Sequence, residues 1–421
     1  MFEVPKDLFV VVSGPSGVGK STLLQGLLAA DLSDIHAKII MPKLVTTRDP
    51  RVSDSANETL CISNQAFQDA VADGKFISTY QVHGHQYGFL ASDVLRERNP
   101  YDRDPVVYIQ TSPTNAGVSL REKLSTTHDV KIFRLMASPE AIHQRLIGRQ
   151  DQLPASELQL RQQSAFKATP EGIDYQINAE QSPSAILETV VRQIKDLLVP
   201  KVPNTELQLT QQELEVLQTV ADVCKSDGTN LCIYAGMAAH IYGSTRTPTD
   251  LDLLIDKSDL EPLRKKLPFD GMVVTEKAIS IGRLDIRKCP MRIGDREKGQ
   301  LWQFDNAARK KQIVVNLGGV LMNVMAPEDV VLAKSCLQRG ADVGKFDLYD
   351  VQNIITNFGA GLDKDYIAQK ARQANVLEMS SACLARFGFH VVDREEMTAS
   401  CSRSDTAPAA LPKLKPRALD A

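Results

Sequence analysis

The stretch that most constrains this chain is a glycine-rich segment at residues 13–22, SGPSGVGKST. An apolar run from Leu8 to Val12 precedes it and predicts a buried strand, while leucines at positions 23, 24, 27 and 28 follow it and predict the apolar face of a helix. A strand, a glycine loop with the pattern GxxxxGKS and a helix form the context of a phosphate-binding loop. The alternative, a glycine-rich turn that binds no ligand, is disfavoured because the full pattern stands in its expected context.

The residues of this loop have separate predicted roles. Glycines let backbone N–H groups close around anionic oxygens, and the N-terminus of the following helix adds positive potential. Lys20 is expected to reach the β and γ phosphates, and the Ser21 hydroxyl is expected to bind Mg²⁺. We therefore expect a nucleoside triphosphate, ATP or GTP, as substrate and Mg²⁺ as cofactor. The predicted nucleotide-binding residues are Gly14, Ser16, Gly17, Gly19, Lys20, Ser21 and Thr22.

Composition limits the classes of protein that the chain can represent. With 421 residues it is too long for one ordinary domain, and a net charge of -3 does not imply a large nucleic-acid footprint, although a local basic groove stays open. Its seven cysteines are odd in number and contain no CxxC pair, which predicts reduced thiols rather than a zinc site or a disulfide framework. The N-terminus is typical of a core strand and not of a signal peptide, and no apolar run is long enough to span a membrane. We therefore expect a cytoplasmic protein without a membrane partner.

A second group of polar residues follows the loop helix. Arg48 and Arg51 lie three residues apart beside a pair of threonines, and guanidinium groups grip phosphate oxygens in a fork, so this pair suits a second anion. Solvated surface arginines are the alternative for this segment. A metal site at His83 and His85 is disfavoured, since zinc requires three or four ligands.

Strands and helices alternate along the first half of the chain. Residues 106–109 and 131–136 predict strands, and Ser138 followed by Pro139 predicts the start of a helix that carries Arg145 and Arg149. This alternation predicts an α/β domain in which a parallel sheet has helices on both faces, a three-layer arrangement.

Four motifs in order and spacing give these observations a family context. The runs SGPSGVGKSTL, TTRDPR, HGHQYG and ASPEAIHQRLIGR, together with Phe67 and a GKF turn, resemble the guanylate kinase family over about the first 200 residues. The resemblance implies phosphoryl transfer by a P-loop kinase. By resemblance, Arg48 and Arg51 hold the acceptor's phosphate and Tyr87 helps to close the acceptor pocket. The same resemblance places three arginines on the lid side, where they neutralise the moving charge: Arg145, Arg149 and Arg161.

Three positions depart from the family pattern. Thr59 stands where a tyrosine helps to hold the acceptor phosphate, Ser78 where a glutamate reads guanine, and Gln110 where an acid ends the next strand. A guanine edge presents N–H donors that require a carboxylate acceptor, so we expect an acceptor other than plain GMP. The HGxxYG run is also similar to ribose bisphosphate phosphokinases, which phosphorylate a phosphorylated sugar. The alternative is a degenerate domain that binds nucleotide without turnover.

The chain changes character near residue 200. Residues 186–198 predict a helix, two prolines in 200–205 predict a linker, and residues 210–224 predict a new amphipathic helix. The predicted division is a guanylate kinase-like domain at 1–200, a linker at 201–208, a second domain at 209–395 and a flexible tail at 396–421.

Carboxylates mark the second domain. Asp250 and Asp252 alternate along a predicted strand and therefore point to one face, where they repel unless a divalent cation lies between them. Two-metal phosphoryl-transfer sites are built in this way. Asp285, in a predicted strand over residues 279–287, is a candidate third ligand because a lone carboxylate among apolar residues requires a reason. A solvated turn is the alternative for the Asp-x-Asp pair.

This half of the chain resembles the minimal nucleotidyltransferases of the polymerase-β type over about residues 210–360. The likeness continues in Lys334, Arg339, a Lys-Phe-Asp run at 345–347 and Asp350, which is similar to the branch containing toxin–antitoxin and abortive-infection enzymes. Ala235-Gly236 departs from the glycine pair or Gly-Ser usual there. The resemblance implies an α+β nucleotidyltransferase domain with a helical C-terminal extension at residues 362–392. By resemblance, metals are bound by Asp250, Asp252 and Asp285, the triphosphate lies near Ser244 and Arg246, and Lys334 steadies the nucleotide.

The sequence thus supports several hypotheses about function. The first is a bifunctional enzyme: an NTP-dependent kinase acting on a phosphorylated small molecule or nucleotide, and a Mg²⁺-dependent nucleotidyltransferase adding NMP to a hydroxyl or phosphate. Its acceptors include a sugar phosphate, a nucleotide or the end of an RNA such as tRNA. The alternatives are a nucleotide-sensing regulator and a toxin-like nucleotidyltransferase that modifies RNA or protein.

Overall fold

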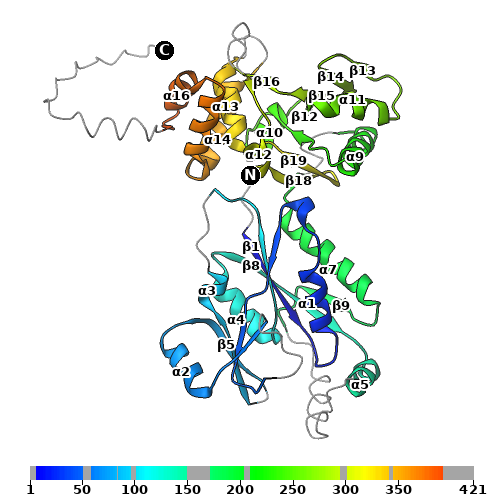
Figure 1. The fold of residues 1–421 in the computed structure, drawn as a ribbon, viewed down its shortest axis with the longest axis vertical. Coiled ribbons are helices and arrows are strands. Elements are labelled where there is room, and N and C mark those ends of the chain that lie inside the picture. The colour runs from blue at the N-terminus through cyan, green and yellow to red at the C-terminus, as the bar shows by residue number, and fades with distance from the viewer. Residues whose placement is uncertain are drawn as a thin grey trace, which may run out of the picture.

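Two units, each built around its own β-sheet, make up the described part of the chain (Figure 1). The computed structural model describes residues 6–50, 58–82, 84–95, 101–148, 171–202, 209–293, 301–340 and 345–391. The first unit contains a five-stranded sheet and a smaller four-stranded sheet, and the second contains an eight-stranded sheet covered by helices.

The larger sheet of the first unit is parallel, with strand order β2-β7-β1-β8-β9. Its strands are β1 (Asp7–Ser13), β2 (Lys38–Ile40), β7 (Val106–Thr111), β8 (His128–Met136) and β9 (Tyr175–Asn178). Residues 8–12 of the central strand β1 are at most 1% exposed, because helices cover both faces of the sheet. The predicted parallel sheet is therefore confirmed.

Alternate residues of β1 divide the first unit into two cores. Val10 and Val12 pack with leucines of α1 (Lys20–Leu28) and apolar residues of α7 (Pro183–Leu198), whereas Phe9 and Val11 pack with Leu120 of α4 (Thr114–Leu124). Helix α5 (Pro139–Ile147) begins as predicted, because the Ser138 hydroxyl accepts a hydrogen bond from the Ala141 N–H at 3.3 Å.

The four-stranded sheet carries the predicted acceptor side and has the order β4-β3-β6-β5. Its elements are β3 (Leu44–Thr46), β4 (Thr59–Cys61), α2 (Asn64–Ala72), β5 (Phe76–Val82), β6 (His85–Leu90) and α3 (Ala91–Val94). Phe67 of α2 stacks on Phe76 with ring centroids 4.6 Å apart, which fixes the helix against the sheet.

The second unit contains a mixed sheet with the order β10-β18-β19-β11-β12-β15-β14-β13. Its strands are β10 (Lys201–Val202), β11 (Cys232–Ile233), β12 (Leu251–Asp256), β13 (Val273–Val274), β14 (Ala278–Ile281), β15 (Leu284–Cys289), β18 (Ile313–Leu317) and β19 (Val320–Val324). A separate pair is formed by β16 (Met291–Arg292) and β17 (Leu301–Trp302).

Two local features of this unit differ from the predicted segments. Residues 201–202, the first two of the predicted linker, form the edge strand β10, since the Asn316 N–H donates to the Pro200 carbonyl and starts a parallel pairing with β18. The rest of the predicted linker, residues 203–208, lies outside the described residues. Residues 279–287 form a hairpin instead of one strand, because Gly282 adopts a φ of 57° and reverses the chain.

Helices cover this sheet. They are α9 (Gln211–Ser226), α10 (Ala235–Ile241), α11 (Lys257–Lys266), α12 (Asn306–Lys310), α13 (Pro327–Leu337), α14 (Asp347–Phe358), α15 (Lys364–Gln373) and α16 (Leu377–Ala385). Three of them, α9, α15 and α16, lie in segments predicted to be helical. Helices α15 and α16 form the expected helical extension and pack on α13, whose residues 327–336 are all buried. Within the described ranges, no helix has the length and apolar character needed to cross a bilayer.

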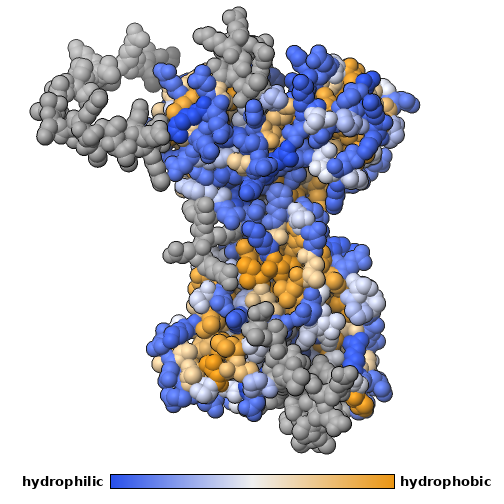
Figure 2. Space-filling view, in the orientation of Figure 1, coloured by the Kyte–Doolittle hydropathy of each residue, from blue (hydrophilic) through white to orange (hydrophobic). Residues whose placement is uncertain are grey.

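A buried ion pair joins the two units. Arg103, in the segment before β7, donates to both carboxylate oxygens of Glu328 on α13, at 2.8 and 3.0 Å, and to the Gly361 carbonyl at 2.8 Å. Arg103 is 8% exposed and Glu328 is fully buried. Val314 of β18 joins the core of the first unit, so the contact is apolar as well as charged. On the face drawn in Figure 2, apolar residues gather on the first unit near this junction, whereas the second unit is mainly hydrophilic.

Replacing Arg103 with methionine is expected to destabilise the second unit by about 3–5 kcal/mol, because Glu328 is then left buried without its counter-charge. Urea unfolding followed by tryptophan fluorescence measures this loss, since the single tryptophan, Trp302, is 1% exposed within that unit. The double variant Arg103→Met with Glu328→Met is expected to recover part of the loss, because it leaves no unpaired charge.

Arg264→Met supplies the matched control for this measurement. Arg264 pairs with Glu261 on the surface of α11, and both side chains are about half exposed, so the expected change is within about 0.5 kcal/mol. A loss in Arg103→Met no larger than in Arg264→Met contradicts the structural role given to the Arg103–Glu328 pair.

Candidate functional site

The glycine loop connects the end of β1 to α1, and its shape requires glycine. Gly14, Gly17 and Gly19 have φ values of 137°, 85° and 109°, which side-chain-bearing residues rarely adopt. A Cβ on Gly14 would lie 2.7 Å from the Leu135 carbonyl oxygen, and one on Gly17 would lie 2.9 Å from the Leu146 side chain. Gly19, which precedes α1, has no side chain to cap the helix, and the start of a helix favours an anion.

Lys20 lies across this loop. Its Nζ donates to the carbonyl oxygens of Gly14 and Pro15, at 2.9 and 2.8 Å, which places the ammonium charge beside the backbone of the loop. Ser21 and Thr22 are exposed on the first turn of α1. The Ser21 hydroxyl is an oxygen ligand of the kind that Mg²⁺ accepts, so the residue fits its predicted role.

Arg145 contacts the loop from α5. Its guanidinium donates to the Val18 carbonyl at 3.0 Å and to the Ala179 carbonyl at 2.7 Å. It therefore lies beside the glycine loop, and its hydrogen bonds to backbone carbonyls brace the loop against the segment after β9. Its role on the lid side stays a prediction. The other two predicted lid arginines, Arg149 and Arg161, lie outside the described residues.

Part of the predicted acceptor site, on the four-stranded sheet, lies outside the described residues. Arg48 follows β3, where its backbone N–H donates to the Thr46 hydroxyl and its guanidinium donates to the Asp49 carbonyl at 2.9 Å. Tyr87 of β6 stacks on Tyr80 with ring centroids 5.3 Å apart and planes 8° apart. Arg51 and His83 lie outside the described residues.

Two positions that bear on guanine recognition are buried and lack a carboxylate. Ser78 on β5 is 2% exposed. The Gln110 amide donates to the Pro42 carbonyl at 2.7 Å and accepts from the Thr111 N–H at 2.7 Å, so the backbone satisfies both ends of the amide. Neither side chain offers the charged acceptor that a guanine edge requires.

Sequence reasoning missed one basic residue beside the loop. Arg134 on β8 is the register partner of Ser13, the last residue of β1, and its Nη1 lies 3.4 Å from the Thr114 hydroxyl. The Thr114 and Ser13 hydroxyls are 2.7 Å apart. In the sequence, this residue could have been noticed as the arginine within the predicted strand 131–136, shortly before the predicted helix start at Ser138.

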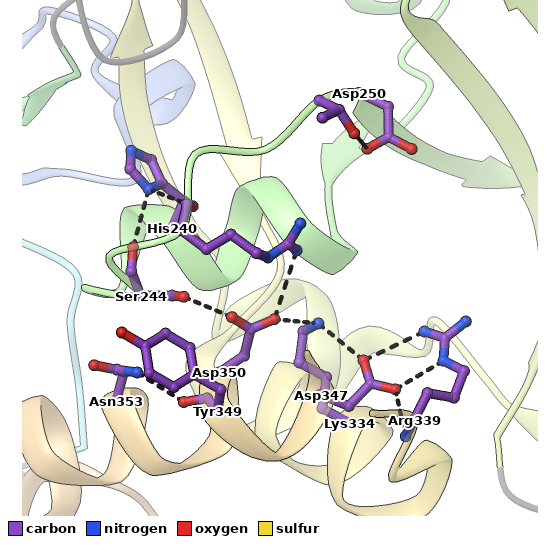
Figure 3. Close-up of polar contacts among 11 residues, drawn as sticks. His240, Ser244, Asp250, Lys334, Arg339, Asp347, Tyr349, Asp350 and Asn353 are labelled. Atoms are coloured by element: carbon purple, nitrogen blue, oxygen red, sulfur yellow. Dashed lines mark hydrogen bonds and ion pairs between the residues drawn. The ribbon is translucent and has the colours of Figure 1, made fainter. Parts of the chain in front are cut away.

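In the second unit, three of the predicted nucleotide-binding residues converge on one carboxylate. Asp350 of α14, 1% exposed, accepts a hydrogen bond from the Ser244 hydroxyl at 2.5 Å, and its Oδ2 lies 2.7 Å from Lys334 Nζ and 3.8 Å from Arg246 Nη2 (Figure 3). Lys334 also pairs with Asp347, which Arg339 holds from its other side. The ammonium of Lys334 is therefore engaged by two buried carboxylates.

The three predicted metal ligands are neighbours but do not form one cluster. Asp252 and Asp285 are register partners on the parallel strands β12 and β15, and Asp250 directly precedes β12. Burial, and then the charge of Asp250, raises the pKa of Asp252 to about 6. In the described ranges, however, no three His, Cys, Asp or Glu side chains are placed to hold a metal ion.

Asp285 is paired within the protein, and its role as a third metal ligand stays a prediction. Its carboxylate accepts from the Ser280 hydroxyl at 2.8 Å and from Arg287 Nε at 2.7 Å. Arg287 lies two residues further along β15 and so on the same face of the strand, where it neutralises the charge that a metal would otherwise balance. The spacing Asp-x-Arg was the sequence signal for this pairing.

Comparison with known proteins gives matches for the first unit. The family model described as "Guanylate kinase" matches residues 6–198. The guanylate kinase of Clostridium perfringens (strain SM101 / Type A) is 32% identical over 164 residues, which are 38% of this chain and 70% of that protein. The ribose 1,5-bisphosphate phosphokinase PhnN of Bradyrhizobium diazoefficiens is 30% identical over 143 residues, 33% of this chain and 65% of that protein. The solved guanylate kinase of Anaplasma phagocytophilum is 16% identical, with a TM-score of 0.31 over 45% of this chain and 86% of that chain.

Lys334→Met is expected to destabilise the second unit by about 3–5 kcal/mol, because Asp350 and Asp347 lose the charge that compensates their burial. Arg246→Met is expected to cost less, since Arg246 is 3.8 Å from Asp350 and its side chain is 26% exposed. Urea unfolding followed by Trp302 fluorescence compares the two variants. Equal losses in both, or no loss in Lys334→Met, contradict a structural role for the lysine.

Proposed function

Because this chain belongs to the guanylate kinase family through residues 6–198, we propose that its first unit transfers the γ-phosphoryl group of ATP or GTP to a phosphorylated acceptor. The observation that carries the proposal is the glycine loop at the end of β1, with Lys20 across it and the uncapped start of α1 behind it. These groups supply a preorganised positive environment in which phosphoryl transfer is accelerated by electrostatic stabilisation.

The residues have separate roles in this proposal. Backbone N–H groups of the loop and of α1 hold the phosphates, and the Lys20 ammonium exchanges the Gly14 and Pro15 carbonyls for oxygens of the β and γ phosphates. The Ser21 hydroxyl is the predicted ligand for Mg²⁺, which neutralises phosphate charge when it is bound with the triphosphate. Arg145 keeps the loop in place through the Val18 carbonyl.

The acceptor in this proposal is a phosphorylated sugar, with GMP as the competing candidate. Arg48, Arg51 and Tyr87 are assigned to the acceptor and its phosphate. The absence of a carboxylate at Ser78 and Gln110, whose side chains are buried, favours the sugar because a guanine edge would find no charged acceptor there. The similarity to a ribose 1,5-bisphosphate phosphokinase points to the same class.

The test uses the full chain with γ-labelled ATP and GTP, and with ribose 1,5-bisphosphate and GMP as acceptors. Lys20→Ala is expected to lower kcat by about 100-fold or more, because it removes a charge that stabilises the transition state. Lys123→Ala, an exposed lysine on α4, is the matched control and is expected to leave kcat unchanged. Transfer that persists unchanged in Lys20→Ala contradicts the proposal.

We further propose that the second unit is a nucleotidyltransferase that adds a nucleoside monophosphate to a hydroxyl or phosphate, with RNA as one acceptor class. The observation that favours it is the placement of the aspartates: Asp252 and Asp285 are register partners on β12 and β15, and Asp250 directly precedes β12. The raised pKa of Asp252, caused by burial and by the charge of Asp250, agrees with a role in binding. Because the described residues do not assemble three metal-binding carboxylates, Mg²⁺ remains a prediction for this unit and no step is assigned to it.

Incubation of the full chain with α-labelled nucleoside triphosphates and cellular RNA tests this second proposal. Label is expected to enter RNA, and Asp252→Asn is expected to abolish it, while Asp270→Asn, at an exposed position, leaves it unchanged. A nucleotide-sensing regulator would bind the triphosphate and transfer no label. Transfer that is equal in Asp252→Asn and in the unaltered chain contradicts the role given to Asp252.

A further inference from the structure

Arg134 occupies the edge of the parallel sheet where the glycine loop begins. It is the register partner of Ser13 on β1, and Gly14 follows Ser13 directly. Its neighbours in β8, Phe133 and Leu135, belong to the core under α1 and α7, whereas Ile132 belongs to the core under α4. By the alternation of side chains along a strand, Arg134 lies on the α4 face. The acceptor-side sheet packs against α4 through β5, so Arg134 lies between the loop and the acceptor side.

The guanidinium of Arg134 is poorly satisfied. Its Nε is buried and finds no hydrogen-bond partner among the residues that the structure describes, and its Nη1 contact with the Thr114 hydroxyl is long, at 3.4 Å. No carboxylate in the described ranges forms an ion pair with it. Arg134 as a whole is half-buried, and this partial burial lowers the pKa of its guanidinium. Such an arrangement costs free energy unless an anion restores the lost interactions.

The surroundings of this guanidinium suit an anion. The Ser13 and Thr114 side chains are almost fully buried and share a hydrogen bond of 2.7 Å, so both hydroxyls are held in place. Thr114 is also the first residue of α4, an eleven-residue helix whose start has no side-chain cap. A guanidinium, the one hydroxyl hydrogen that the Ser13–Thr114 pair leaves free and a helix start form a set of donors that matches a phosphate group.

We propose that Arg134, supported by Ser13 and Thr114, is a phosphate-binding residue of the kinase site. The inference rests on the proposed kinase function and adds to it an arginine that contacts a phosphate group between the loop and the acceptor side. That phosphate belongs either to the donor, as the γ group being transferred, or to the acceptor. A purely structural role for Arg134 accounts less well for its buried Nε, which the long hydrogen bond from Nη1 to a neutral hydroxyl does not satisfy.

The test measures equilibrium affinities of the full chain for four probes: Mg·ATP, Mg·ADP, GMP and ribose 1,5-bisphosphate. Arg134→Gln is expected to weaken at least one of them by about 10- to 100-fold, the loss typical for charge-assisted hydrogen bonds. A loss for Mg·ATP without a loss for Mg·ADP assigns Arg134 to the γ phosphate. A loss for GMP or ribose 1,5-bisphosphate with Mg·ATP unchanged assigns it to the acceptor.

Two further variants make the measurement decisive. Arg134→Lys keeps the charge but loses the fork, so its affinity is expected to fall between those of the unaltered chain and Arg134→Gln; it also serves as the test if the glutamine variant does not fold. Arg192→Gln, an exposed position on α7, is the control and is expected to change no affinity.

Separate outcomes overturn the inference and the kinase function. If Lys20→Ala abolishes Mg·ATP binding while Arg134→Gln and Arg134→Lys leave all four affinities within about twofold of the unaltered chain, the role of Arg134 is wrong and the kinase function stands. If Lys20→Ala leaves Mg·ATP binding unchanged, the kinase function itself fails.

Discussion

Close contact between the glycine loop and its neighbours is the constraint on which the first unit depends. The Leu135 carbonyl lies so close to Gly14, and the Leu146 side chain so close to Gly17, that neither glycine has room for a Cβ. Both glycines also have positive φ. The backbone of the loop is therefore fixed from β8 and α5. The loop follows the buried central strand β1 and lies at the edge of the sheet. The side chains of Lys20, Arg145 and Arg134 place positive charges beside the loop.

The second constraint is the buried pair between Arg103 and Glu328, which links the two units through one helix. Glu328 lies in the first turn of α13, and Lys334 lies further along the same helix, where it pairs with Asp350 and Asp347. One almost fully buried helix, α13, thus contributes both to the contact between the units and to the polar network of the second unit. A shift of α13 would disturb both, so we expect the structure around Asp350 to depend on the first unit.

Local patterns predicted much of the fold, because strand periodicity, glycine loops and helix caps act over a few residues. Residues 8–12 and Ser138 are examples, and their strand and helix start are confirmed. Contacts between distant residues were not predictable in the same way: Arg103 and Glu328 are 225 residues apart. The pairing of Asp285 with Arg287 was readable as an i, i+2 spacing but was overlooked, and the burial that gives Arg134 its significance appears only when β1, β8 and α4 are packed together.

A crystal structure of the full chain with Mg²⁺ and a non-hydrolysable ATP analogue tests the central claim most directly. The account predicts that the triphosphate lies over residues 14–20, and that Lys20 Nζ has left the Gly14 and Pro15 carbonyls for oxygens of the β and γ phosphates. A triphosphate bound elsewhere on the first unit, with Lys20 still bonded to both carbonyls, would contradict it.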